Sequence, residues 1–291
     1  MEIALHLGAH LTDEGQLDKC LRKNRSELVD AGIIVRRTSD YLNLMRGAAN
    51  ALATGTDTPD FMAQLTAAMK APADARRLFF SAPGLLTTLS QVTDGTTLYP
   101  GTMARVAAYR HLLAGAETEI FVAIRNPASF IPALLRELAD FERAEILENL
   151  RPEEMRWSLF IDEIRQGWPE ASLTIWCDED TPFVWHRLLR LVSGYEPETD
   201  FKNSFNWFDS VMIKGGAEKL AKYLEVNPPV DEAHRQQVIS AFLDKYCDPA
   251  KLEVDVSIAG WDETQTDVIS ELYEDDVDLI RNMEGVRFIS P

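Results

Sequence analysis

The chain has 291 residues, 46% of them hydrophobic, and it carries 47 acidic against 29 basic side chains, a formal net charge of −18. A chain of this length and composition can bury a substantial core. The excess of acid disfavours binding to DNA, RNA or an anionic membrane, because the mean field of such a protein repels a polyanion. We therefore expect neither a nucleic acid nor a membrane as partner.

The sequence also indicates the compartment. No window approaches the ~18 consecutive apolar residues of a membrane span. The start, MEIALHLGAH, lacks the basic residues and the long apolar region of a signal peptide. Cys20, Cys177 and Cys247 are far apart and form no CxxC pair, so neither a disulfide framework nor a zinc knuckle is predicted. We expect a cytoplasmic protein.

Short apolar strands alternate with amphipathic helices over the first two thirds of the chain. The predicted strands cover residues 2–7, 33–35, 78–80, 119–124 and 173–176. The predicted helices are one that begins at Thr12 and includes Leu28, then 41–53, 59–69, 102–113, one with Phe130 to Phe141 facing inward, one around Trp157 to Ile164, and 182–192. This alternation predicts a three-layer α/β fold with a mostly parallel sheet of about five strands.

From residue 194 the pattern becomes helical, and only 286–289 is expected as a terminal edge strand. We expect residues 1–193 to form the α/β core and residues 194–291 a helical extension packed on it as one structural unit. Three charged or aromatic runs are assigned structural roles: Arg22, Lys23 and Arg25 as a solvated face, 274–278 likewise, and 201–208 with Trp207 mainly as packing, with a pocket or partner surface as the alternative.

The segment LHLGAHLTDEG, residues 5–15, leaves a strand and opens a helix. In phosphate-binding loops this geometry points backbone N–H groups and the positive end of the helix at an anion. A Lys and Ser or Thr hydroxyls usually supplement these donors. The layout therefore predicts an anion site, but the side chains do not follow the usual pattern.

Two motifs resemble the bacterial branch of the P-loop sulfotransferases, and the order of elements extends the resemblance over most of the chain. Gly8, Ala9, His10 and Thr12 match a family loop that reads like Gly-Ala-His-Lys-Thr-Gly-Thr-Thr. Residues 122–127, VAIRNP, resemble the strand, Arg and Pro of the family's 3′-phosphate motif. The resemblance implies a sulfotransferase fold, the donor PAPS as cofactor, and Arg125 as the main remaining anion contact.

The chain departs from the family at the residues that bind the donor. Leu11 stands where the family has its Lys, and Asp13, Glu14 and Gly15 stand where it has Gly-Thr-Thr. The second motif has Ala133 in place of a Ser. Ser81-Ala82-Pro83 replaces a turn that carries a catalytic acid in many relatives. Replacing a cation by an alkyl chain and adding two carboxylates changes the local charge by three units, against phosphate binding.

Two interpretations of the loop follow. In the first, Thr12 caps the helix, Asp13 and Glu14 favour its positive end, and the helix has capped itself where a nucleotide would bind. In the second, a rearranged anion site is retained and binds PAPS or its product PAP. Its residues would be Gly8, Ala9, His10, Thr12, Gly15 and Arg125, with Arg105 as a candidate neighbour.

Further chemistry is weakly indicated. His10 is the candidate general base, because it lies in the presumptive pocket. Asp178, Glu179 and Asp180 follow a strand and are candidate Mg²⁺ ligands, although acids before Thr181 and Pro182 are also what a helix start favours. No GxSxG motif supports a hydrolase.

The leading hypothesis is a sulfotransferase-like protein with a degenerate PAPS-binding loop that acts by binding a small molecule or a protein. The alternative is a divergent PAPS-dependent sulfotransferase acting on a hydroxyl acceptor. A metal-assisted enzyme that uses the three acids at 178–180 is a third hypothesis.

Overall fold

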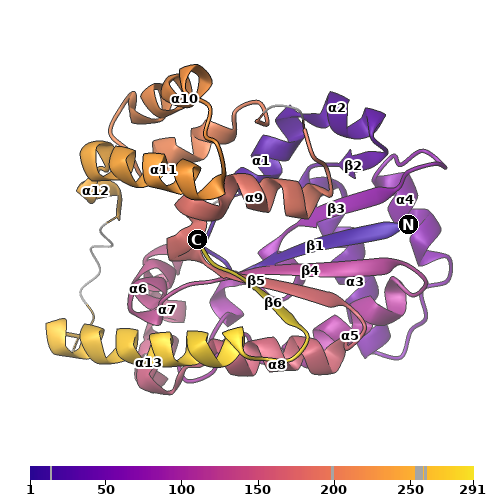
Figure 1. Ribbon diagram of the computed structural model, residues 1–291. Coiled ribbons are helices and arrows are strands. Elements are labelled where there is room, and N and C mark those ends of the chain that lie inside the picture. The colour runs from indigo at the N-terminus through magenta and orange to yellow at the C-terminus, as the bar shows by residue number, and fades with distance from the viewer. Residues whose placement is uncertain (14, 198–199, 253–257, 259–260) are drawn as a thin grey trace.

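The computed structural model describes residues 1–13, 15–197, 200–252, 258 and 261–291 (Figure 1). Within them, six strands form one parallel sheet in the spatial order β2-β3-β1-β4-β5-β6. The strands are β1 Glu2–Gly8, β2 Ile33–Val35, β3 Arg77–Ser81, β4 Glu117–Ile124, β5 Ser172–Cys177 and β6 Val286–Ile289.

Helices lie between successive strands along the chain. They are α1 Gln16–Lys23, α2 Arg25–Asp30, α3 Leu42–Ala53, α4 Phe61–Ala68, α5 Thr102–Leu112, α6 Pro127–Glu137, α7 Asp140–Asn149, α8 Trp157–Gly167, α9 Thr181–Ser193, α10 Gly216–Val226, α11 Glu232–Tyr246, α12 Pro249–Leu252 and α13 Glu263–Arg281. Among the described residues, no helix is both long and apolar enough to span a bilayer.

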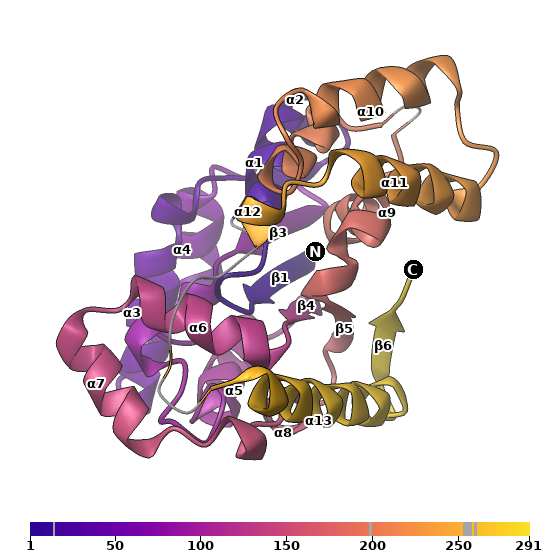
Figure 2. The same cartoon turned by 90° about the vertical axis from the view of Figure 1, so that its left-hand side faces the viewer.

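Two hydrophobic cores sandwich the sheet, one on each face. Side chains of α1, α2, α9, α10 and α11 pack on the face that carries Ala4, Phe79 and Trp176. Side chains of α3 to α8 and of α13 pack on the face that carries Leu5 and Phe80. Figure 2 shows the sheet between these layers, with α9 to α11 on one side and α8 and α13 on the other. The predicted α/β class with a sheet covered on both faces is confirmed.

The last strand joins the sheet rather than lying outside it. β6 pairs in parallel with β5, with Phe288 opposite Ile175. The predicted terminal edge strand is therefore present, and the sheet has six strands instead of about five. The strand follows α13, which packs against α8, so the C-terminal segment completes both the sheet and one helix layer.

Two helix predictions are wrong because the helices break. The helix expected from Thr12 through Leu28 is two helices, separated at Asn24, whose side-chain amide donates to the carbonyl of Cys20 (2.8 Å). Phe141, expected to face inward, is 73% exposed. Phe141 belongs to α7, which is a separate helix from α6. The spacing of apolar residues along α6 therefore does not predict which way Phe141 faces.

The acidic run at 274–278 is also not uniformly solvated. Asp276 is buried, and its Oδ2 accepts the backbone N–H of Ser158 (3.0 Å), in the first turn of α8. A carboxylate from one helix thus satisfies an N-terminal amide of another, a favourable position for negative charge.

Candidate functional site

The carboxyl ends of β1, β4 and β5 lie side by side at one edge of the sheet, because these strands are parallel neighbours. From β1 the chain crosses to β2 on one side, and from β4 it crosses to β5 on the other. Open α/β sheets bind ligands at such a topological switch point. The structure brings residues 9–13, Gly15 and Arg125 together there, since the Arg125 guanidinium Nη1 donates to the carbonyl of Leu11 (2.7 Å).

Gly8 begins the loop in a conformation that suits glycine. Its φ is 114°, and a Cβ at this position would meet the side chain of Pro83 at 3.0 Å and the backbone nitrogen of His10 at 3.1 Å. The backbone N–H of Ala9 then donates to the carbonyl of Ala123 on β4 (2.7 Å). Close packing between segments therefore accounts for Gly8 without any ligand.

Asp13 occupies the amides that an anion would need. Its Oδ1 accepts the backbone N–H of Gly15 (3.1 Å) and its Oδ2 that of Leu17 (2.8 Å). The N–H of Gln16 donates to the main-chain carbonyl of Asp13 (2.9 Å). Three consecutive amides at the start of α1 are thus satisfied by one residue, which is only 8% exposed. The loop carries its own anion where a phosphate-binding loop would hold a ligand.

Thr12 does not cap the helix, contrary to the prediction. Its hydroxyl donates to the carbonyl of Ala9 (2.9 Å), which closes the loop on itself, and Gly15 precedes the first turn of α1 in a left-handed conformation. The capping role belongs to Asp13, which the sequence indicated only as a favourable charge near the helix start. Glu14 lies outside the described residues.

Arg125 is held within the protein by side-chain and main-chain oxygens. Besides the Leu11 carbonyl, it contacts Ser129, because its Nε donates to the hydroxyl (3.0 Å). Its own carbonyl accepts from the indole of Trp157 (2.8 Å). Sequence reasoning looked for a Ser eight residues after the Arg and found Ala133. It did not single out Ser129, which lies four residues after Arg125 in the first turn of α6.

His10 is neutral, and its ring Nδ1 is hydrogen-bonded to Tyr99. The Tyr99 hydroxyl accepts the backbone N–H of His10 (2.7 Å) and lies 2.8 Å from its Nδ1. Burial lowers the pKa of His10 to about 4. Because the hydroxyl accepts from the backbone, its proton is available to Nδ1, and this favours the Nε2–H tautomer. The candidate base is therefore a weak one, positioned by a tyrosine that the sequence did not single out.

A second histidine lies beneath the loop. His6, fully buried on β1, has its Nδ1 2.8 Å from the Ser81 hydroxyl on β3 and stacks on Trp176 with ring centroids 5.7 Å apart. Burial lowers its pKa, and the negative charge of Asp13 partly opposes this. Its Nε2 has no hydrogen-bond partner among the described residues. The pair joins adjacent strands at the edge of the site.

Asp178 is a half-buried carboxyl beside Arg125 and Asp13. Burial raises the pKa of its carboxyl to about 7; the neighbouring charges of Glu179 and Asp13 raise it too, whereas Arg125 and the Thr181 hydroxyl lower it. Asp13 and Arg125 therefore both act electrostatically on the Asp178 carboxyl, in opposite directions. The sequence placed Asp178 at a strand end, but only the fold shows that it is desolvated.

The three acids at 178–180 do not converge on a cation. Glu179 accepts the backbone N–H of Asn126 (2.7 Å) and the hydroxyl of Tyr273 (3.2 Å), whereas Asp178 accepts from Thr181 (3.4 Å). Over the part of the chain that the structure describes, no group of three or more His, Cys, Asp or Glu side chains could hold a metal ion. The metal-assisted hypothesis thus has no support in this geometry.

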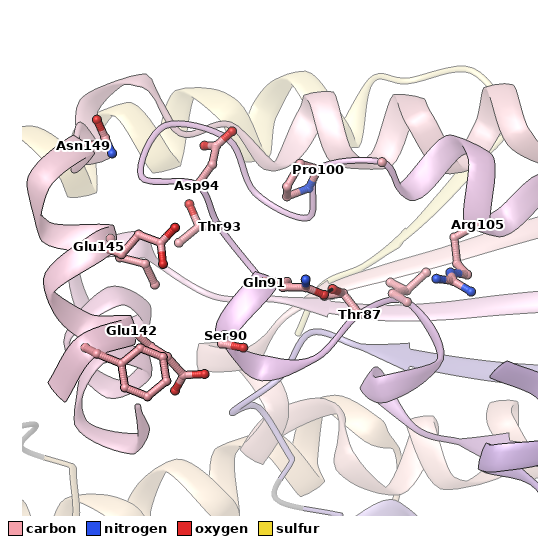
Figure 3. Close-up of a pocket in the computed structure, with 14 residues that line it drawn as sticks. Thr87, Ser90, Gln91, Thr93, Asp94, Pro100, Arg105, Glu142, Glu145 and Asn149 are labelled. Carbon is pink, nitrogen blue, oxygen red and sulfur yellow. Dashed lines mark hydrogen bonds between the residues drawn. The ribbon is translucent and has the colours of Figure 1, made fainter. Parts of the chain in front are cut away.

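A large cavity lies outside the loop, and none of the described residues 8–13 and 15 lines it. Its volume is about 700 Å³, and it lies between α7, the segment after β3 and the start of α5. Figure 3 shows Glu142 and Glu145 on α7 facing Ser90 and Thr93. The lining residues are Leu86, Thr87, Ser90, Gln91, Thr93, Asp94, Pro100, Gly101, Arg105, Phe141, Glu142, Glu145, Ile146 and Asn149.

Arg105 belongs to this cavity rather than to the anion cluster. Its guanidinium donates to the side-chain oxygen of Asn50 on α3 (2.6 Å). Pro100, which follows the His10-bound Tyr99 in sequence, also lines the cavity. Arg105, expected as a neighbour of the anion site, thus bonds to Asn50, whereas Arg125 bonds to Leu11 and Ser129.

The Asp13 cap predicts a specific loss of stability. Replacing Asp13 by Ala leaves the amides of Gly15 and Leu17 without acceptors, so we expect the free energy of unfolding to fall by about 1–2 kcal/mol. Asp13→Asn keeps one acceptor oxygen and should lose less. Urea denaturation measures both variants, and an Asp13→Ala protein as stable as the wild type would contradict the assignment.

The raised pKa of the half-buried Asp178 carboxyl predicts a pH dependence of stability. Its pKa is raised from 3.8 to about 7, so between these values the folded protein binds a proton that the unfolded chain has released. Stability from this group is present at low pH and is lost as the pH rises through about 7. The stability of Asp178→Asn relative to wild type should therefore increase by about 1–3 kcal/mol between pH 5 and 8. Parallel stability curves for the two proteins would refute this.

Comparisons of the chain with known protein families, with curated proteins and with solved structures found no match.

Proposed function

We propose that this chain is a sulfotransferase-like binding protein in which the loop after β1 does not hold the sulfonate donor PAPS. The observation that carries the proposal is the Asp13 carboxylate on the amides of Gly15 and Leu17. A donor phosphate could reach these amides only by displacing a carboxylate that belongs to the chain. An intramolecular acceptor is present at all times and needs no association entropy, so it competes strongly with a ligand.

Electrostatics supports the same conclusion. Asp13 is nearly buried, and Asp178 adds a carboxyl whose pKa of about 7 leaves it partly ionised at neutral pH. Two like charges 4 Å apart repel by about 1 kcal/mol in water and by about 4 kcal/mol near a protein surface. Leu11, in place of the family's Lys, supplies no compensating charge.

The second candidate is a divergent PAPS-dependent sulfotransferase acting on a hydroxyl acceptor, and Arg125 is the observation that favours it. Its guanidinium lies at the switch point, where an anion would bind, and Ser129 provides a hydroxyl beside it. A lone Arg already bonded to Leu11 and Ser129 is a weaker anion site than a full loop. His10, with its pKa near 4, would also be a poor base.

The cavity of about 700 Å³ is the place where we propose that a ligand binds, since known ligand sites cover this range of volumes. Glu145 makes no hydrogen bond or ion pair within the described residues, and Glu142 uses one oxygen on the N–H of Ala139 (3.2 Å). Phe141, Leu86 and Ile146 add apolar wall. A small molecule with an ammonium group and an apolar part fits this lining.

Titration with PAP, the desulfonated donor, tests the loss of donor binding. We expect no heat of binding in calorimetry up to about 1 mM PAP, because the amides are occupied and the buried carboxylates repel phosphate. Micromolar binding that Arg125→Ala abolishes would instead support the working enzyme.

The matched gain-of-function variant combines Leu11→Lys, Asp13→Gly and Glu14→Thr, which restores the family's residues at these positions. It should create PAP binding, because it removes the resident carboxylate and returns the cation. No gain in a variant that remains folded by circular dichroism would count against the placement of the loop.

The ligand cavity is tested with phenethylammonium as a probe. Glu145→Gln should weaken its binding about fivefold, or ~1 kcal/mol, because one carboxylate of a partly exposed ion pair is lost. Glu148→Gln is the control, since Glu148 lies on the same helix and does not line the cavity. Calorimetry that finds the same affinity in both variants, or no binding in the wild type, would refute the site.

A further inference from the structure

A second cavity lies on the opposite face of the sheet, where the outer side of α1 meets α9 and the 3₁₀ segment Ser204–Ser210. Its volume is about 390 Å³. Its lining residues are Gln16, Lys19, Cys20, Arg22, Lys23, Trp185, Asn203, Asn206 and Trp207. The basic run of α1 and the aromatic run at 201–208, about 180 residues apart, thus form the walls of one hollow.

The charge of this cavity is opposite to that of the protein. Lys19, Arg22 and Lys23 are spaced at i, i+3 and i+4 on α1 and therefore share one face of the helix. No carboxylate occurs among the described residues that line the cavity, although the chain has a net charge of −18. Arg22 is paired with Asp18 (2.8 Å), which does not line the cavity, whereas Lys23 forms no ion pair or side-chain hydrogen bond with the described residues. The hollow is thus a positive region on a negative molecule.

The cavity also offers polar groups that the protein does not use. The side chains of Gln16, Asn203 and Asn206 make no hydrogen bond within the part of the chain that the structure describes, and neither does the indole N–H of Trp207. Trp185 differs, because its N–H donates to the carbonyl of Ser204 (2.6 Å) and it packs against Trp207 with ring centroids 5.8 Å apart. Trp207 is 8% exposed, so part of its surface borders the hollow.

The cavity is preformed, because hydrogen bonds join its two walls. Asn24, buried between them, donates to the carbonyl of Lys202 (3.0 Å) and accepts the Lys202 N–H at its side-chain oxygen (2.9 Å). The same side chain bonds to the carbonyl of Cys20 in α1 (2.8 Å). One asparagine therefore fixes the end of α1 to the segment that carries Asn203 and Trp207. A preformed site binds with less loss of entropy than one that must order.

We propose that this cavity binds a small planar organic anion, an aromatic ring that carries a phosphate, sulfate or carboxylate. Lys23 and Arg22 bind the charged group, the amides of Asn203 and Asn206 donate to its oxygens, and the ring packs beside Trp207. The volume suits a ligand of this size. The site shares no lining residue with the cavity of about 700 Å³, so it does not depend on the function proposed above.

Phenyl phosphate is the probe. Its binding to the full chain is measured by tryptophan fluorescence and by calorimetry. We expect a dissociation constant of about 0.1–1 mM, weaker binding of inorganic phosphate and of neutral benzyl alcohol, and a loss of affinity at high salt. Lys23→Gln should weaken binding about fivefold or more. Arg25→Gln is the matched control, because it removes the same charge from the same basic run and Arg25 does not line the cavity.

Trp207→Phe is a second, independent test. It removes the unpaired indole N–H, so we expect a smaller change in fluorescence on binding. Lys23→Gln, by contrast, keeps both indole rings. Retained affinity in Lys23→Gln, or an equal loss in Lys23→Gln and Arg25→Gln, would overturn the proposal. So would equal affinity for phenyl phosphate and inorganic phosphate, or no binding at about 10 mM.

Discussion

The bond between the Asp13 carboxylate and the first amides of α1 is the constraint on which the interpretation of this protein depends. A helix start leaves N–H groups without partners, and the fold brings these groups to the edge where parallel strands end. Whatever satisfies them decides what the edge can bind. Here the Asp13 carboxylate accepts hydrogen bonds from these N–H groups. The Arg125 guanidinium donates to the Leu11 carbonyl, so this donor is already used within the protein.

The groups beneath the loop are consistent with a closed site. His6 and Ser81 bond across adjacent strands, and His10 bonds to Tyr99, so both rings are neutral and held in place. Asp178 is desolvated but lies near a cation, which limits the cost of its burial. Polar side chains thus gather beneath the loop and contact one another.

Charge is distributed unevenly between the two cavities described above. The larger one has Asp94, Glu142 and Glu145 in its lining against a single Arg, which follows the acidic balance of the chain. The smaller one has three cations and two indoles, which opposes that balance. A protein with a net charge of −18 repels anions on average, so a positive hollow on it would select them locally. The two cavities would therefore take ligands of opposite charge.

The sequence by itself determined the alternation of strands and helices, the parallel sheet and the sheet end at which the loop after β1 and Arg125 lie, because these follow from local hydrophobic period and from strand direction. It also indicated that the loop carries acids close to the start of α1. It did not predict which residue caps α1, the break at Asn24 or the exposure of Phe141, because neighbouring capping groups and helix ends compete within fractions of a kcal/mol.

Only the tertiary structure decided which distant side chains meet. Crossovers between strands bring together residues that lie tens to hundreds of positions apart in sequence. Examples are the contacts of His10 with Tyr99, of His6 with Ser81 and of Ser158 with Asp276, and the cavity that both Lys23 and Trp207 line. Desolvation of Asp178 is likewise a property of the packed protein. Periodicity contains no information on such contacts, because it describes the face of an element and not what packs against it.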